Sequence, residues 1–113
     1  MIECVPCGRH AQKVLFKRKP DETTSIGSFG LRTCDDRYEI WSLGIVGEYR
    51  RKGYATQMLT EFIQQFQHDK PIVLYVYKIN KVAIHLYEKV GFVIVGDCYF
   101  DQSAYKMQYG LDV

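Results

Sequence analysis

The segment from residue 53 to residue 77 constrains the fold most, because it joins one clear helix to one buried strand. Apolar side chains recur there at the spacing i, i+3, i+4, i+7, i+8 and i+11, which places them on one helical face. These residues are Ala55, Met58, Leu59, Phe62, Ile63 and Phe66. The run PIVLYVY that follows is typical of a strand covered on both faces. Because residues 37–46 also read as a strand, we expect a strand-helix-strand crossover.

Further strands are predicted on both sides of this crossover. Residues 1–5, 13–18, 26–33 and 37–46 are separated by turn-forming residues, Pro20 and Asp21 among them, and indicate antiparallel strands. A second helix is expected over residues 80–90, with Asn80 as its N-cap and Gly91 as its C-terminal cap.

The chain is expected to end in two strands, residues 92–100 and 104–111, joined by a turn at DQS. In the last strand, alternate residues up to Leu111 are apolar or aromatic. Together the segments predict a mixed α/β fold: a mostly antiparallel sheet of six to seven strands with two main helices.

Composition narrows the class of protein. A chain of 113 residues suffices for one domain over residues 1–113, and its net charge of +2 argues against a dedicated nucleic-acid or membrane-surface binder. The apolar runs are far shorter than the roughly 20 residues that cross a bilayer, and the first residues lack a signal peptide's apolar stretch. We expect a cytoplasmic protein with reduced cysteines and no membrane partner.

Three cations, Arg50, Arg51 and Lys52, directly precede the first predicted helix. The amino-terminal end of a helix carries unpaired N–H groups and a partial positive charge, and a glycine such as Gly53 lets a ligand approach the backbone. A strand before and a helix after are the context of a phosphate site, most simply for a pyrophosphate. The alternative is a solvated charged face beside a glycine turn.

Two segments resemble motifs of the GNAT superfamily of acyl-CoA-dependent N-acyltransferases. In LGIVGEYRRKGYATQML, the residues Arg50, Gly53 and Ala55 match the motif Arg/Gln-x-x-Gly-x-Gly/Ala. In NKVAIHLYEKVGF, a second motif is matched by Asn80, Ala83, Leu86, Tyr87, Lys89, Gly91 and Phe92. The resemblance covers residues 26–95 well and the rest loosely.

The resemblance implies acetyl-CoA as cosubstrate. The strand at residues 43–45 would pair with the pantetheine arm, the turn amides of residues 51–56 would hold the pyrophosphate, and Asn80 and Tyr87 would lie near the pantetheine and the sulfur. The implied cofactor-binding residues are Leu43, Gly44, Ile45, Arg50, Arg51, Lys52, Gly53, Tyr54, Ala55, Thr56, Asn80, Ala83 and Tyr87.

Two side chains are candidates for catalysis of amine attack on a thioester. Tyr87 is a candidate acid, since a thiol of pKa about 8.5 takes a proton from a tyrosine of pKa about 10 for about 2 kcal/mol. Its alternative role is a packing aromatic. Glu39 resembles the catalytic glutamate of the histone-acetylating branch and alternates onto one face with Trp41, Leu43 and Ile45.

An ordinary glutamate is about 8 kcal/mol too weak to deprotonate a lysine-like ammonium. Glu39 as a base would therefore need a pKa raised by burial, or a bridging water. The alternative is an exposed strand carboxylate that balances Arg37 or a cation of a neighbouring strand.

The chain departs from the family in two places. The strand glutamate of ribosomal-protein-acetylating enzymes is replaced by Tyr75, which disfavours that acceptor class. The family usually has one or two helices between its first two strands, and PCGRHAQ is too short for them. The site for the amine, whether small molecule or protein, is then open, completed by a second subunit of a homodimer, or lost.

Other functions compete with acyl transfer. A CoA-binding or interaction module without turnover fits the missing helices, and a nucleic-acid binder would use residues 17–19 and 50–52. Cys4 and Cys7 have metal-ligand spacing with His10 nearby, but a structural zinc needs about four ligands. We therefore expect no metal and no nucleic acid.

Overall fold

A computed structural model describes residues 1–19, 22–66 and 68–110. The strands are β1 (Ile2–Gly8), β2 (Ala11–Phe16), β3 (Gly27–Thr33), β4 (Tyr38–Ile45), β5 (Ile72–Tyr77), β6 (Val93–Cys98) and β7 (Asp101–Tyr109). The helices are α1 (Tyr54–Gln65) and α2 (Lys81–Val90), and a short 3-10 turn, η1 (Gly47–Tyr49), precedes α1. The predictions at Pro20, Asp21 and Leu111 lie outside the described residues.

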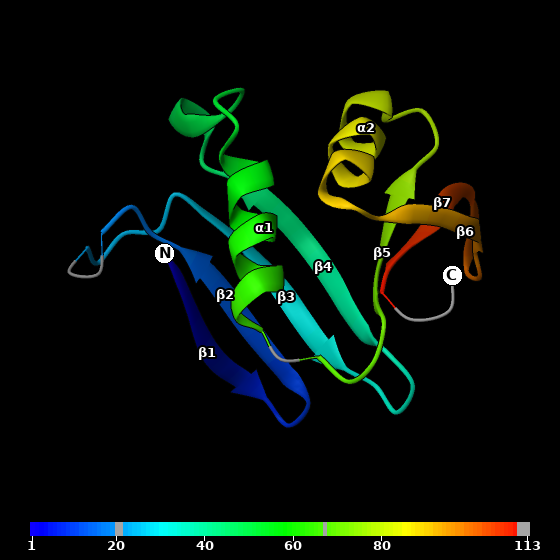
Figure 1. Cartoon of the computed structure of the whole chain (residues 1–113), viewed down its shortest axis with the longest axis horizontal. Helices are drawn as coiled ribbons and strands as arrows, with labels where there is room; N and C mark the ends of the chain where they lie inside the picture. The colour runs from blue at the N-terminus through cyan, green and yellow to red at the C-terminus, as the bar shows by residue number, and fades with distance from the viewer. Residues whose placement is uncertain (20–21, 67, 111–113) are drawn as a thin grey trace.

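The seven strands form one mixed sheet in the order β1-β2-β3-β4-β5-β7-β6 (Figure 1). All neighbouring pairs are antiparallel except β4 and β5, which are parallel. The predicted crossover is confirmed, because α1 connects these two parallel strands. The mixed, mostly antiparallel sheet with two helices is likewise confirmed.

Both helices pack on the same face of the sheet. Met58, Leu59 and Phe62 of α1 and Ile84 of α2 belong to a single buried cluster with residues of five strands. In Figure 1, α1 crosses in front of the strands β2 to β4, and α2 stands beside it near β5. Among the described residues no helix covers the opposite face.

The ends of α2 follow from local chemistry. Asn80 Oδ1 accepts a hydrogen bond of 3.2 Å from the Ala83 N–H, so Asn80 is the N-cap. Gly91 follows the helix at a φ of 122°, a conformation that side chains rarely adopt. A Cβ at this position would also lie 3.0 Å from the Tyr109 ring. Both predicted caps are therefore confirmed.

The predicted turn at DQS is wrong. Tyr99 and Phe100 form the turn, Asp101 begins β7, and Cys98 pairs with Asp101. Asp101 is a good turn residue, but its Oδ1 accepts a 3.0 Å hydrogen bond from the Ser103 N–H within β7. Within this turn, the Phe100 ring packs on the rings of Trp41 and Tyr75.

Candidate functional site

The parallel strands β4 and β5 separate after three residue pairs. The last pair is Ile40 with Leu74, and no pairing follows among the described residues. A cavity of about 170 Å³ lies where the strands diverge, and Tyr87 of α2 lines it together with Tyr75 of β5. The centre of the sheet therefore opens beside α2.

A β-bulge in β4 lies at this opening. Ser42 has a φ of 54°, and the pairing between β3 and β4 shifts register between Ser28 and Gly30. An extra residue on one strand reverses which face the following side chains occupy. Leu43 and Ile45 accordingly pack against the core beneath the helices.

The expectation that Glu39 and Trp41 share a face with Leu43 and Ile45 is therefore wrong. In the sequence, larger and smaller side chains keep alternating across Ser42. In the structure, the bulge moves the residues after Ser42 to the other face of the sheet. Glu39 and Trp41 lie on the sheet face opposite the helices, and their partners come from that face.

A groove of about 350 Å³ runs along the helix-covered side of the opening. It brings together three parts of the chain that are far apart in sequence: the end of β4, the turn before α1, and α2. The predicted cofactor-binding residues that line it are Leu43, Gly44, Ile45, Arg50, Arg51, Gly53, Tyr54, Ala55, Asn80, Ala83 and Tyr87. Lys52 and Thr56 do not line it. Tyr49 lines the groove and was missed, because a tyrosine in a short turn carries no distinctive sequence signal.

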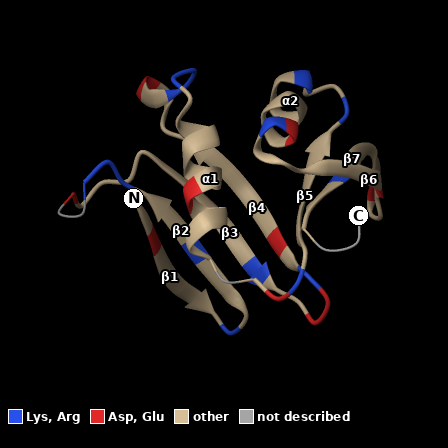
Figure 2. Ribbon diagram, viewed as in Figure 1, with Lys and Arg blue, Asp and Glu red and all other residues tan. Residues whose placement is uncertain are grey.

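The turn at the amino-terminal end of α1 has an unusual backbone. Arg51 and Gly53 both have positive φ values, of 61° and 81°, and no side chain caps the first turn of the helix. Arg50 Nε donates a 3.0 Å hydrogen bond to the Ile45 carbonyl, which ties the turn to the end of β4. The free N–H groups and the exposed cation of Lys52 make this end of α1 electropositive. Figure 2 shows the basic loop above α1.

Tyr87 lines both the groove and the cavity between β4 and β5. Burial raises the pKa of its hydroxyl above the ordinary value near 10. The hydroxyl is therefore protonated throughout the neutral pH range. Because Tyr87 borders both spaces, its protonated hydroxyl is a candidate proton donor.

Glu39 lies in a dense network on the opposite face, with 1% of its surface exposed. Its Oε2 accepts hydrogen bonds from Arg37 Nε at 2.9 Å and from the Tyr75 hydroxyl at 3.0 Å. Its Oε1 accepts a hydrogen bond of 3.0 Å from Trp41 Nε1, and Arg32 Nη1 lies 3.6 Å away. The alternative of a strand carboxylate that balances Arg37 or a cation of a neighbouring strand is correct about the ion pairs, which form with both Arg37 and Arg32, but wrong about exposure, because the carboxylate is buried.

Two effects on the pKa of Glu39 oppose each other. Desolvation raises the pKa, but the hydrogen bonds from Arg37, Trp41 and Tyr75 lower it, and the net direction is downward. The same contact raises the pKa of Tyr75, where burial is the larger cause. A carboxylate held this way stays ionised at neutral pH. It lacks the raised pKa that Glu39 would need to act as the base.

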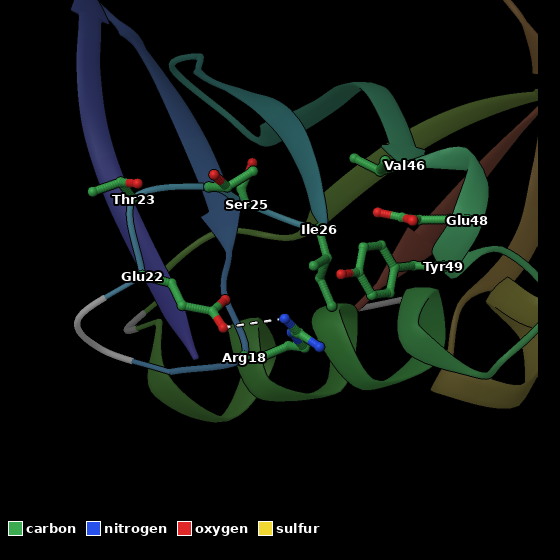
Figure 3. A pocket seen from close by; sticks show the side chains of 9 residues that line it. Arg18, Glu22, Thr23, Ser25, Ile26, Val46, Glu48 and Tyr49 are labelled. Atoms are coloured by element: carbon green, nitrogen blue, oxygen red, sulfur yellow. Dashed lines mark hydrogen bonds and ion pairs between the residues drawn. The ribbon is translucent and has the colours of Figure 1, made fainter.

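A larger hollow of about 500 Å³ lies on the other side of η1 (Figure 3). Arg18 forms an ion pair of 3.3 Å with Glu22 there, and its guanidinium lies 5.3 Å from the centre of the Tyr49 ring. Neither Tyr87 nor Glu39 lines this hollow. The hollow is therefore separate from the two candidate catalytic residues. Tyr49 borders both this hollow and the groove along the helix-covered side.

Metal-ligating residues do not cluster in the described part of the chain. No group of three or more His, Cys, Asp or Glu residues is placed to hold an ion there. Cys4 and Cys7 are exposed on β1, and Cys98 is buried. No described helix is long and apolar enough to cross a membrane.

Comparison with known proteins gives one family and many similar folds. The profile of the acetyltransferase (GNAT) family matches residues 5–92. No match is found among curated protein sequences. A putative GNAT-family acetyltransferase from Bacteroides thetaiotaomicron superposes with a TM-score of 0.72 at 22% identity, covering 92% of this chain and 64% of that one.

Two further similar structures contain coenzyme A. The PaiA N-acetyltransferase from Thermoplasma acidophilum has a TM-score of 0.69 at 25% identity, with 90% of this chain and 62% of that chain covered. A Bacillus subtilis acetyltransferase has a TM-score of 0.73 at 16% identity, with 90% and 78% covered. The chain thus spans under two thirds of the length of two of these three proteins.

Proposed function

Because the chain belongs to the acetyltransferase (GNAT) family, we propose that it transfers the acetyl group of acetyl-CoA to a primary amine. One observation carries the proposal: a single groove joins the end of β4, the turn before α1, and Tyr87. Each of these parts suits a different portion of acetyl-CoA. Coenzyme A in two structures of similar fold supports the same cosubstrate.

The end of β4 suits the pantetheine arm. Gly44 and Ile45 pair with β3 on one side, and beyond Ile40 no described residue of β5 pairs with β4 on the other. Backbone N–H and C=O groups at such an edge need partners. The amide groups of pantetheine supply them in this proposal.

The turn before α1 suits the pyrophosphate. Arg51 and Gly53 have positive φ values and line the groove, and the first turn of α1 has no competing side-chain cap, so its N–H groups are available to an anion. Lys52 and Thr56 lie outside the groove lining. In this proposal Lys52 attracts the phosphates through its charge, and Thr56 makes no direct contact with them. Asn80 lines the groove, while its Oδ1 is occupied as the N-cap of α2.

The reaction forms one bond and breaks one. The ammonium form of the amine first loses a proton to solvent, and the neutral nitrogen attacks the thioester carbonyl carbon. The C–N bond forms, the nitrogen loses a second proton to solvent, and the C–S bond breaks. The departing thiolate takes the proton of the Tyr87 hydroxyl, which is restored from solvent. Because burial raises the pKa of Tyr87, this transfer costs somewhat more than the about 2 kcal/mol of an ordinary tyrosine.

Two measurements test the proposal. Calorimetry should detect binding of acetyl-CoA and of CoA, and a thiol assay across a panel of primary amines should detect amine-dependent release of CoA. Absence of binding at millimolar ligand rejects the proposal. Binding without thiol release from any amine supports the non-catalytic CoA-binding module, which the two-residue turn of Arg9 and His10 between β1 and β2 favours.

A further inference from the structure

A small aromatic cavity of about 170 Å³ lies on the sheet face opposite the helices, next to the separation of β4 and β5. Its lining includes the rings of Trp41, Tyr75, Tyr77 and Phe100, together with Cys98 and Ala104. Trp41 and Phe100 are stacked with centroids 5.9 Å apart, and Tyr75 meets Phe100 edge to face at 5.3 Å. One described lining residue is charged: Asp101, whose Oδ1 accepts hydrogen bonds from Ser103. The wall is therefore mostly apolar.

This aromatic cavity adjoins the place where the thioester lies in the proposed reaction. Tyr75, Val76 and Tyr77 of β5 line both the aromatic cavity and the cavity that contains Tyr87. The two spaces are thus separated by one strand at the point where that strand has lost its pairing with β4. A ligand in the aromatic cavity would therefore lie one strand away from the cavity that Tyr87 lines.

The cavity wall is held in place by Glu39. The buried carboxylate accepts the Trp41 indole N–H on one oxygen and the Tyr75 hydroxyl on the other. Arg37 Nε donates a further hydrogen bond to Oε2, and Arg32 Nη1 forms an ion pair of 3.6 Å with Oε1, so most of the acceptor capacity of the carboxylate is already used. These two hydrogen bonds fix the orientations of the Trp41 and Tyr75 rings, and fixed side chains are what a pre-organised binding pocket requires.

We propose that this cavity binds a flat ring of the acceptor, so that the preferred acceptor is a primary amine on a short linker from an aromatic ring, with Glu39 as a positioning residue. The proposal rests on the proposed acetyl transfer. A cavity near 150 Å³ lined by apolar side chains holds one benzene-sized group, and ring faces favour offset or edge contacts with another ring.

The direct test compares three amines of similar reactivity: phenylethylamine, butylamine and diaminobutane. Binding is followed by the fluorescence of Trp41, the single tryptophan of the chain, with CoA present, and turnover by thiol release. We expect a Kd and a KM at least about tenfold lower for phenylethylamine than for either aliphatic amine. Equal or tighter binding of butylamine or diaminobutane overturns the proposal. If no amine releases thiol, the proposed function fails, and the fluorescence titration still decides the ring-binding cavity.

Neighbouring aromatic residues provide a matched pair of variants. Phe100→Ala removes a lining ring that is 54% exposed, and should raise the Kd of phenylethylamine about tenfold and abolish its preference over butylamine. Tyr99→Ala removes a ring that touches Phe100 but does not line the cavity, and should change the Kd less than threefold. Equal effects of the two substitutions contradict the assignment.

Glu39→Gln separates positioning from proton abstraction. If Glu39 positions the wall, the substitution raises the KM of phenylethylamine more than it lowers kcat, and the acidic limb of the pH-rate profile remains. If Glu39 is the base, kcat falls about a hundredfold or more for every amine and that limb disappears. The second result overturns the positioning role. Circular dichroism of the variant confirms that it is folded before either result is read.

Discussion

The Tyr75 hydroxyl donates a 3.0 Å hydrogen bond to Oε2 of Glu39, across 36 positions of sequence. Glu39 lies on β4 and Tyr75 on β5, and the backbone pairing of these strands ends at Ile40 and Leu74. The side-chain bond therefore links the strands beside the point where they separate. The strands therefore stay connected on the face opposite the helices although their backbone pairing has ended.

The first prediction concerns stability and pH. The pKa of Glu39 is lower in the folded chain than its ordinary value near 4.3, so its ionised form stabilises the fold above that pH. This stabilisation is lost as pH falls through the folded-state pKa. Glu39→Gln should lower the free energy of unfolding by about 2 kcal/mol at pH 7, because it removes charged hydrogen bonds. Urea unfolding measures this difference, which should shrink below pH 4.

The control for this prediction is Glu88→Gln, which changes an exposed carboxylate on α2. The free energy of unfolding of this variant should stay within about 0.5 kcal/mol of that of the unsubstituted protein at both pH 7 and pH 3. A Glu39→Gln difference that is equally large at pH 7 and pH 3 would show that ionisation of Glu39 does not contribute.

The second prediction concerns proton donation to the leaving thiolate. Tyr87→Phe removes the hydroxyl that lines the groove and keeps the ring that packs against Phe92. Turnover should fall about a hundredfold, since general acid catalysis contributes at least that factor, and the Kd of CoA should change less than threefold. A thiol assay measures turnover, and calorimetry measures the Kd of CoA. Tyr105→Phe, whose side chain lines neither cavity, is the control, and equal rates in both variants exclude Tyr87 as the acid.

Local patterns predicted the elements well, because they depend on neighbours in sequence. The spacing of apolar residues in α1 and the unbroken apolar run of β5 each report burial directly. The bulge at Ser42 left no such signal, since an ordinary serine adopts a positive φ there and the residues on either side still alternate. The faces of Glu39 and Leu43 could therefore not be assigned from alternation.

The partners of Glu39 were only partly predictable for a related reason. Arg37 is two residues away and Arg32 lies on the adjacent antiparallel strand, so both were accessible to a local argument. Tyr75 reaches Glu39 through the register of a parallel pair joined by a helix. That register depends on how α1 packs, which no local pattern specifies. The aromatic wall around Glu39 was missed for this reason.

The third prediction concerns the turn before α1. Gly53 has a φ of 81°, and a Cβ there would meet no atom within 4 Å, so Gly53→Ala acts through backbone conformation alone. It should lower the free energy of unfolding by about 1 kcal/mol and weaken CoA binding about fivefold as the turn shifts. Gly47→Ala also adds a Cβ in open space but at a φ outside the left-handed region, and should change neither quantity appreciably. Thermal unfolding and calorimetry of both variants give the comparison.

The fourth prediction concerns the exposed cations, and it separates charge from shape. Arg51 and Lys52 are exposed, and neither side chain forms an ion pair or a hydrogen bond within residues 1–19, 22–66 and 68–110. A charge about 4 Å from a phosphate contributes about 1 kcal/mol in water, so Lys52→Ala should weaken CoA binding about fivefold at low ionic strength. At 1 M salt the Debye length is about 3 Å, and the effect should fall below twofold.

Pantetheine, which lacks phosphates, should bind both forms equally at either salt concentration. Lys89→Ala at the far end of α2 is the matched control; if it weakens CoA as much as Lys52→Ala does, the effect comes from net charge and the phosphates are not held at this turn.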